Sequence, residues 1–375
     1  MTIHDDLLRS GEKALFELRA LYRTYGYTQY KMSKFEEYDL YVRNQGRLVH
    51  DGIIAFTDTN GRLMALKPDV TLSIIKNSKD QPGVIQKVCY NENVYRVSKN
   101  THAFKEIMQT GLECMGDIDL YSITEVLQLA AESLNRIRPA FQLDISHMGL
   151  LMGLIAPLGL DENDQAALLR CVSAKNMHEL RARCAECDVP ADRTAALVKL
   201  AAAYGPMADV LRTVEPLCTE PAMRSAWAQL SELAEALRET PFADRIQFDF
   251  SVVNPTDYYD GIVFQGFVDG IPDRVLSGGQ YDRLMHRMGR KSGAIGFAVY
   301  MDLLERLGDE KPPYDVDTLL LYDAQEPVPE LMRTVQMLTS NGRTVLAEKA
   351  MPAGVHARQT LRLQNRRLEI LENNG

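Results

Sequence analysis

The sequence lacks the features of a membrane protein and of a metal-binding protein. No segment of its 375 residues approaches the roughly 20 consecutive apolar residues that a helix needs to cross a bilayer. Of six cysteines, only Cys184 and Cys187 have a spacing found in metal sites, and neither has a second Cys or His pair nearby. We attribute that spacing to helical crowding, and we expect neither a metal nor a cofactor.

An excess of positive charge is also missing. The formal net charge is -9 at pH 7, and the sequence pI is near 5.4. This balance gives no general attraction for a phosphate backbone, so it argues against a nucleic-acid partner. The first residues place leucines at helical spacing among charges, unlike the uninterrupted apolar segment of a signal peptide. We therefore expect the protein to stay in the cytoplasm.

Residues 1–148 combine a long helix with strands that tight turns connect. Asn60-Gly61 lies between two short apolar runs and predicts a type I′ hairpin. Ser122 followed by Glu125, before an apolar helical run, predicts a capping box that opens a helix.

Strands return near residue 245, where Asp269-Gly270 predicts another hairpin. The sheet that begins in the first segment should therefore be completed here. Antiparallel strands with separate helices predict an α+β fold, in which residues 1–148 and 244–310 form one domain. Between them, residues 149–243 are rich in Leu, Ala, Arg and Glu at helical spacing, which predicts an all-helical insertion.

After a proline-containing linker, residues 313–375 predict a small C-terminal unit. A strand at 318–322, a helix from about Pro329 and a strand at 344–347 predict one βαβ unit. The arginine-rich segment LRLQNRRLEIL could be a basic tail for nucleic acid, but its leucines favour a solvated helix. The residues expected to face inward are Leu361, Leu363, Leu368 and Leu371.

Two polar stretches are candidates for a binding site. In LKPDVT, Asp69 could cap the next helix with help from Thr71, or it could contact a ligand. In the strand that follows a polar loop, Gln109, Gly111 and Glu113 have the even spacing that puts them on one face. An amide and a carboxylate beside a glycine form a small polar floor that is open to a ligand.

Two further stretches bring tyrosines beside glycines. DYYDGIVF contains Tyr258 and Tyr259, and SGGQYD contains Tyr281. Each tyrosine taken alone is best explained by aromatic packing around a turn, and paired glycines alone indicate little.

Together these stretches resemble the histidyl-tRNA synthetase family, a branch of the class II aminoacyl-tRNA synthetases, in order and over nearly all of residues 1–307. VYRVSKNTHAFKEIMQTGLECMG resembles the second class II motif, and AIGFAVYMDLLERL resembles the third. LKPDVT and the two tyrosine stretches resemble the family's histidine-binding segments. The resemblance implies a six-stranded antiparallel sheet with helices and a dimer formed through the first motif.

The resemblance also implies a histidine pocket. Asp69 matches the position of a Glu that meets the α-amino group, and Gln109 and Glu113 would face the amino acid. Carboxylates and tyrosine rings attract a cationic ligand through charge-assisted hydrogen bonds and cation–π contacts. The positions that match the pocket are Asp69, Thr71, Gln109, Glu113, Tyr258, Tyr259 and Tyr281.

The residues that would hold ATP are largely replaced. Ser98 stands where the family has a Glu for adenine, Asn254 where it has an Arg for the α-phosphate, and Leu303 where it has an Arg for the terminal phosphate. Tyr300 replaces a Gly, and only Arg96 remains as a phosphate-type contact. Removing one transition-state donor slows catalysis roughly a hundred- to a thousandfold, so we expect no catalytic residues.

A slipped alignment would let Arg245 or Arg306 take a missing role. Arg306, however, lies three positions beyond Leu303, so it would need an altered helix end. The C-terminal unit is also smaller than the anticodon-binding domain that the resemblance implies.

Family members with these losses resemble the regulatory subunit that accompanies the short-form catalytic subunit of ATP phosphoribosyltransferase. The resemblance implies a homodimer within a hetero-oligomer, with histidine as effector. Three alternatives remain: a true histidyl-tRNA synthetase, a paralogue that makes aminoacyl adenylate for another purpose, and a histidine sensor that acts without an enzymatic partner.

Overall fold

The computed structural model describes residues 8–44, 52–81, 83–98, 101–253, 258–307 and 313–374. The chain divides into two compact units, Met1–Gly308 and Asp309–Gly375. A nine-stranded sheet and a three-stranded sheet belong to the larger unit, and a four-stranded sheet belongs to the smaller one.

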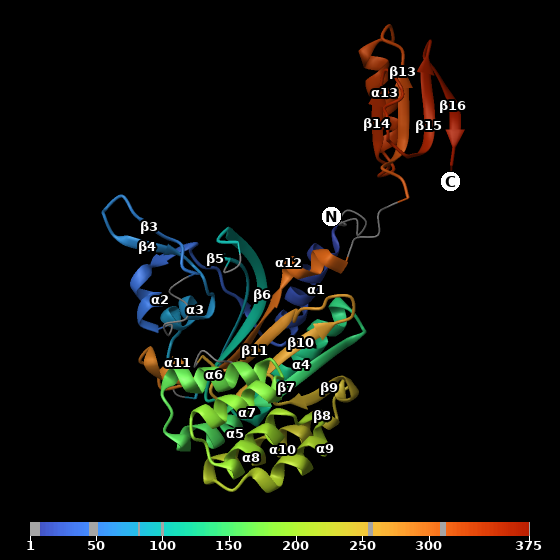
Figure 1. Cartoon of the computed structure of the whole chain (residues 1–375). Helices are drawn as coiled ribbons and strands as arrows, with labels where there is room; N and C mark the ends of the chain where they lie inside the picture. Colours follow the sequence, from blue (N-terminus) through green and yellow to red (C-terminus); the bar gives the residue numbers. More distant parts are fainter. Residues whose placement is uncertain are drawn as a thin grey trace. The chain divides into compact units, whose positions relative to one another are not determined.

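The nine-stranded sheet organises the larger unit (Figure 1). Its strands lie in the order β1 (Thr28–Gln29), β5 (Gln86–Val97), β6 (Phe104–Gly116), β12 (Gly293–Tyr300), β11 (Leu276–Gln280), β10 (Ile262–Val268), β7 (Phe141–His147), β9 (Ile246–Asp249) and β8 (Tyr204–Pro206). The six strands from β5 to β7 are antiparallel to their neighbours, whereas β1 is parallel to β5 and β9 is parallel to β7. The predicted α+β fold and its six central antiparallel strands are confirmed.

The two faces of this sheet differ in chemistry. One row of residues in register is apolar and includes Leu112, Phe297 and Phe264. Helices α1 (Ser10–Thr24) and α4 (Leu120–Ile137) pack on that face, where the Tyr22 ring lies 5.9 Å from that of Phe297. The opposite face carries Glu113 and is available for polar contacts.

Helix α4 begins earlier than the sequence predicted. Asp119 is its N-cap, and the Asp119 carboxylate accepts the backbone N–H of Ser122 at 2.8 Å. The predicted capping box of Ser122 and Glu125 is therefore wrong. Glu125 instead forms an ion pair with Lys87 at 2.6 Å, because the helix register turns it toward β5.

A small three-stranded sheet lies beside the main one. Its order is β2 (Phe35–Glu37), β4 (Leu63–Leu66) and β3 (Ala55–Thr57), accompanied by α2 (Tyr38–Asn44) and α3 (Thr71–Asn77). The predicted β3–β4 hairpin forms, but it is not a two-residue type I′ turn. Among its central residues only Gly61 has a positive φ, and the Asp58 carboxylate accepts the N–H groups of Asn60 and Arg62, which widens the loop.

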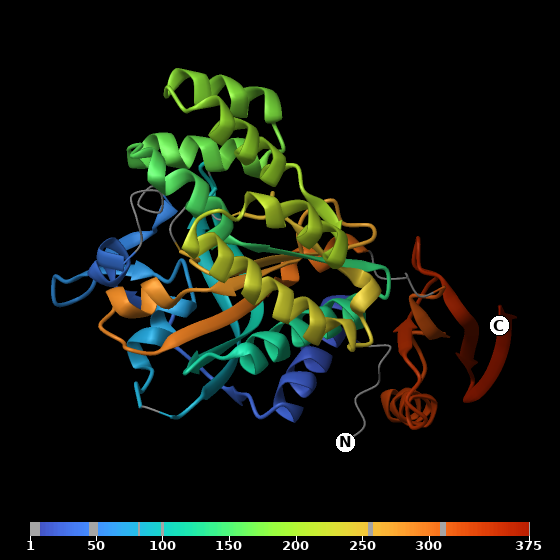
Figure 2. The same ribbon diagram turned by 90° about the horizontal axis from the view of Figure 1, so that it is seen from below.

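Residues 149–243 are mostly helical, and Figure 2 shows their helices gathered beside the main sheet. The helices are α5 (Met148–Ile155), α6 (Glu162–Ser173), α7 (Met177–Glu186), α8 (Ala191–Ala201), α9 (Met207–Val214) and α10 (Pro221–Arg238). The segment is not all helical, because β8 pairs with β9 and extends the main sheet. Strand β8 has only three residues, too few for an alternating pattern to be recognised in the sequence.

The hairpin predicted at Asp269-Gly270 is confirmed as an antiparallel pair of β10 and β11, in which Gly266 lies opposite Leu276. Helix α11 (Asp282–Arg287) follows β11, and α12 (Met301–Leu304) follows β12. Short 3₁₀ turns are present at Ala156–Leu158, Glu215–Leu217, Ala243–Arg245 and Glu305–Leu307.

The smaller unit contains the predicted βαβ arrangement. Strand β13 (Val316–Tyr322), helix α13 (Val328–Thr339) and strand β14 (Val345–Glu348) follow one another, and the two strands are parallel. The four-stranded sheet has the order β14-β13-β15-β16.

The helix predicted near the C-terminus is wrong. Strands β15 (Ala357–Gln364) and β16 (Arg367–Asn373) form an antiparallel hairpin instead. Asn365 and Arg366 turn the chain with φ values of 50° and 59°. Leu361 and Leu363 alternate with exposed residues and pack against α13, so the true period is two.

Candidate functional site

The residues predicted to form a pocket come from four segments of the larger unit. They are Asp69 before α3, Thr71 at its first position, Gln109 and Glu113 on β6, Tyr258 and Tyr259 before β10, and Tyr281 after β11. Hydrogen bonds and ring contacts join members of all four segments.

Glu113 is at the centre of these contacts, with only 2% of its surface exposed. Thr71 Oγ1 donates to Oε1 at 2.7 Å, and the Tyr281 hydroxyl donates to Oε2 at 2.5 Å. Burial, with a smaller contribution from the charge of Asp69, raises the pKa of Glu113 to about 8. At neutral pH the carboxyl group therefore tends to be protonated, and a nearby cation would favour its ionised form.

The three tyrosines form one aromatic cluster. The ring centroids of Tyr258 and Tyr259 are 4.9 Å apart with an interplanar angle of 82°. Those of Tyr258 and Tyr281 are 6.0 Å apart. Edge-to-face packing of this kind stabilises the cluster, and a ring face that remains accessible can attract a cation.

Two glycines leave room for this cluster. Gly296 lies opposite Glu113 in the sheet, and a Cβ at Gly296 would overlap the Glu113 carboxylate. Gly279 lies opposite Gly296, and a Cβ there would come within 2.9 Å of the Tyr259 ring. The carboxylate and the ring thus lie directly over two positions of the sheet that have no side chain.

One carboxylate oxygen of Asp69 accepts a backbone N–H at the start of α3, as the helix-capping interpretation predicted. Oδ1 accepts the backbone N–H of Leu72 at 3.0 Å. Burial raises the pKa of the Asp69 carboxyl, and the charge of Arg96 partly opposes that effect. Arg96 itself donates Nε–H to the carbonyl of Pro68 at 2.8 Å, so it lies beside the same segment.

Gln109 is buried on the same face of β6 as Glu113, as its even spacing predicted. It lies opposite Glu92 on β5 and Tyr300 on β12. Glu92 forms an ion pair with the fully buried Lys67, which precedes Asp69 by two residues. No pattern in the sequence indicated this buried pair.

Tyr300 also faces the pocket side of the sheet. Its hydroxyl lies 2.9 Å from Ser277 Oγ. Burial is the main cause of the raised pKa of Tyr259, and the electrostatic effect of Tyr300 is the second. The Tyr300 ring therefore covers a part of the sheet that a glycine at this position would leave open. Tyr90, which lies opposite Gly111, is a further buried tyrosine of this face that sequence reasoning missed.

Among the described residues, the other positions expected for ATP provide no phosphate clamp. Asn254 lies outside the described residues. Leu303, on α12, packs against the apolar core. Arg306 forms an ion pair with Asp273 at 2.7 Å, and Ser98 lies in the β5–β6 turn, where its N–H bonds the Ala103 carbonyl.

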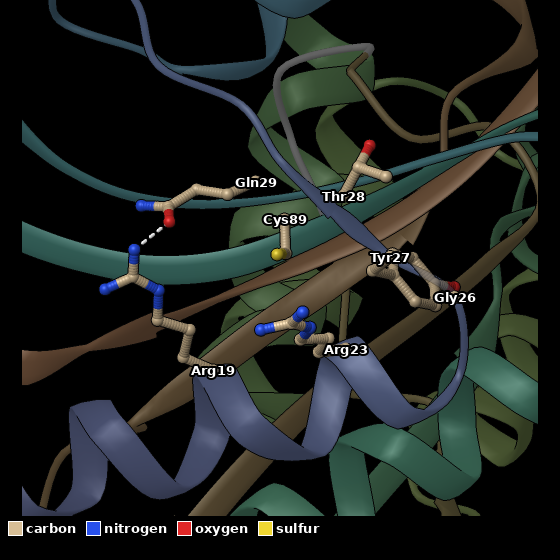
Figure 3. Close-up of a pocket in the computed structure, with 7 residues that line it drawn as sticks. All are labelled: Arg19, Arg23, Gly26, Tyr27, Thr28, Gln29 and Cys89. Carbon is tan, nitrogen blue, oxygen red and sulfur yellow. Dashed lines mark hydrogen bonds between the residues drawn. The ribbon is translucent and has the colours of Figure 1, made fainter.

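A separate cavity of about 480 Å³ lies between α1, β1 and β5 (Figure 3). In Figure 3, Arg19 and Arg23 project from α1 toward the strands, and Arg19 bonds the Gln29 amide oxygen. The cavity is lined by Arg19, Arg23, Gly26, Tyr27, Thr28, Gln29 and Cys89. None of the residues predicted for the amino-acid pocket lines it.

Within the described ranges, no group of three or more His, Cys, Asp or Glu side chains could hold a metal ion. Cys184 is fully buried and Cys187 is partly exposed, and both are free thiols. No helix in the described part of the chain has the length and apolar character needed to span a membrane.

Six antiparallel strands, with a carboxylate and tyrosines on the face opposite the long helices, define a class II aminoacyl-tRNA synthetase-like protein. The sequence profile of the histidyl-tRNA synthetase family matches residues 6–304. The chain belongs to this family.

Similar proteins include both regulatory subunits and synthetases. An ATP phosphoribosyltransferase regulatory subunit from Oceanobacillus iheyensis is 26% identical over 348 residues, which cover 91% of this chain and 85% of the relative. A crystal structure from Bacillus halodurans, described as an ATP phosphoribosyltransferase regulatory subunit/histidyl-tRNA synthetase, has a TM-score of 0.79 at 23% identity and covers 96% of both chains. A histidyl-tRNA synthetase structure from Nostoc sp. has a TM-score of 0.72 at 17% identity, over 93% of this chain and 86% of that one.

Proposed function

We propose that this chain is a non-catalytic regulatory subunit of ATP phosphoribosyltransferase, the first enzyme of histidine biosynthesis. In this proposal it forms a homodimer within a cytoplasmic hetero-oligomer with the short-form catalytic subunit, and histidine is its effector. The curated relatives that carry this name support the assignment.

One structural contrast carries the proposal. The amino-acid side of the site has a hydrogen-bond network, in which Thr71 and Tyr281 both bond Glu113. On the nucleotide side, Leu303 belongs to the core and Tyr300 covers the sheet. A pocket that can bind an amino acid without activating it is suited to sensing.

The chemistry of the pocket favours histidine. Asp69 is the candidate partner of the α-ammonium group, since its carboxylate oxygens accept charge-assisted N–H bonds. Glu113 and the phenols of Tyr258 and Tyr281 provide acceptors, donors and ring edges for an imidazole. Gln109 would contact the amino acid beside Glu113, and Arg96 remains the candidate contact for an anionic group. The ligand residues proposed here are those predicted from the sequence.

Mixing this chain with a short-form catalytic subunit tests the proposal. We expect co-elution on size exclusion at micromolar concentration and phosphoribosyl-ATP formation that requires both chains. A catalytic subunit that is fully active alone, or that does not co-elute, would refute the regulatory role.

A pyrophosphate-exchange assay separates the enzymatic alternatives. A true synthetase or an adenylate-forming paralogue would exchange pyrophosphate in the presence of histidine, whereas a regulatory subunit would not. Histidine binding without co-elution would instead support the sensor that acts alone.

A further inference from the structure

Tyr41, on α2, is a buried tyrosine that takes no part in the contacts around Glu113. None of its surface is exposed, and it packs in the same apolar cluster as Tyr90, Tyr258 and Tyr281. Its hydroxyl has no hydrogen-bond partner among the residues that the structure describes. A buried hydroxyl without a partner is unfavourable, so this one requires an explanation.

The charges of two carboxylates act on the Tyr41 hydroxyl and raise its pKa. Burial is the main cause of the raised pKa of Tyr41. The charge of Asp69 is the second cause, and the charge of Glu36 is the third. Glu36 is engaged elsewhere, because it accepts from Ser73 Oγ and pairs with Lys76 at 2.8 Å. Helix α2 contacts α3, and Tyr41 shares its apolar cluster with Val70, the residue that follows Asp69, so its side chain lies beside the Asp69 segment of the pocket.

We propose that Tyr41 is a specificity-determining residue of the pocket, whose hydroxyl oxygen accepts an N–H from the ligand ammonium held by Asp69. The inference rests on the proposed function, because it assumes that the pocket binds an amino acid. An ammonium group has three N–H donors, and a carboxylate and a phenol oxygen together accept at least two of them. A ligand without an amino group would leave the Tyr41 oxygen unpaired, so this residue selects for a free α-amino group.

Two matched tyrosine-to-phenylalanine substitutions test this role. Tyr22 is as buried as Tyr41, but its hydroxyl has a partner, Ser133 Oγ, at 3.0 Å on the other side of the sheet. Tyr22→Phe should lower the melting temperature and leave histidine binding unchanged. Tyr41→Phe should leave the melting temperature unchanged or raise it, and should weaken histidine binding roughly tenfold, as expected for one hydrogen bond to a charged group.

The deamino analogue of histidine, imidazole propionate, identifies the group that Tyr41 contacts. Calorimetric titration of the full chain should show that this analogue binds more weakly than histidine and equally well to the parent and to Tyr41→Phe. Selectivity for histidine over the analogue should therefore fall roughly tenfold in Tyr41→Phe.

Three results would overturn the role of Tyr41. They are unchanged histidine binding in Tyr41→Phe, an equal loss of affinity for both ligands, and a fall in melting temperature as large as that of Tyr22→Phe. Failure of the parent chain to bind histidine would be a different outcome, since it would refute the proposed ligand itself.

Discussion

The Tyr281 hydroxyl lies 2.5 Å from Oε2 of Glu113, although 168 residues separate them in the chain. Strand β12 lies between β6, which carries Glu113, and β11, which Tyr281 follows, and Gly296 leaves the space in which the two groups meet. An acid and a phenol are therefore held in direct contact by the sheet itself. The contact is independent of the groups that would bind ATP.

Loss of this contact should affect both stability and binding. Tyr281→Phe removes a donor from a buried carboxyl group, which should lower the free energy of unfolding by about 1–3 kcal/mol. Histidine affinity should fall roughly tenfold, because Glu113 loses the partner that fixes its orientation. Urea unfolding and calorimetric titration would measure the two effects. Unchanged values for both would show that the contact has no energetic role.

The raised pKa of Glu113 predicts how stability depends on pH. Its pKa is near 4.5 in an ordinary environment and about 8 in the folded chain. Between these values the folded state keeps a proton that the unfolded state has lost, so stability should fall as pH rises. Asp69 and Tyr281 face this carboxyl group, and the raised pKa of Asp69 acts in the same direction.

Glu113→Gln should flatten this pH dependence, because the amide does not titrate. Urea unfolding at several values between about pH 5 and 8 would compare the variant with the parent. Histidine should also reduce the fall in the parent, since the positive charge of a bound ligand favours the ionised carboxylate. Parallel curves for the parent and Glu113→Gln would contradict the assignment.

The chain should show no histidine-dependent pyrophosphate exchange. Asn254→Arg together with Leu303→Arg should not restore it, because Tyr300 still covers the sheet and effects within one catalytic unit are not additive. A histidyl-tRNA synthetase assayed in parallel is the positive control. Turnover by the parent at a synthetase-like rate would contradict the absence of ATP chemistry.

The turn of the C-terminal hairpin should improve with glycine. Arg366 has a φ of 59°, which costs a residue with a Cβ more than it costs glycine. Arg366→Gly should stabilise the hairpin by about 0.5–1 kcal/mol, seen as slower amide exchange of β15 and β16 in the full chain. Arg358→Gly, at an exposed strand position, is the matched control and should speed exchange. Slower exchange in the control alone would contradict the turn geometry.

Sequence patterns predicted which polar side chains share a face better than they predicted the local structure around them. Even spacing placed Gln109 and Glu113 on one face, because a strand has a period of two whatever surrounds it. Tyr41 and Lys67 gave no such signal, since their burial depends on contacts between distant segments. Sequence spacing alone contains no information on those contacts.

The wrong predictions of the C-terminal helix and of the capping box have local physical causes. The leucines near the C-terminus fit a helix and a strand pattern, and the left-handed turn at Asn365 and Arg366 decides between them. Likewise, Ser122 has the residue type of an N-cap, but Asp119 three residues earlier takes that role. Residues with equivalent capping chemistry cannot be ranked without the packing of the helix.

A histidine titration of reconstituted phosphoribosyl transfer tests the regulatory role most directly. The two subunits would be mixed, and product formation followed with the parent chain, with Glu113→Ala and with Tyr22→Phe as the matched control. We expect histidine to inhibit the complexes containing the parent and Tyr22→Phe, because it binds their inactive state more tightly by roughly 1–3 kcal/mol. We expect Glu113→Ala to activate the catalytic subunit but to lose that inhibition. Inhibition that survives Glu113→Ala unchanged would show that histidine acts at another site.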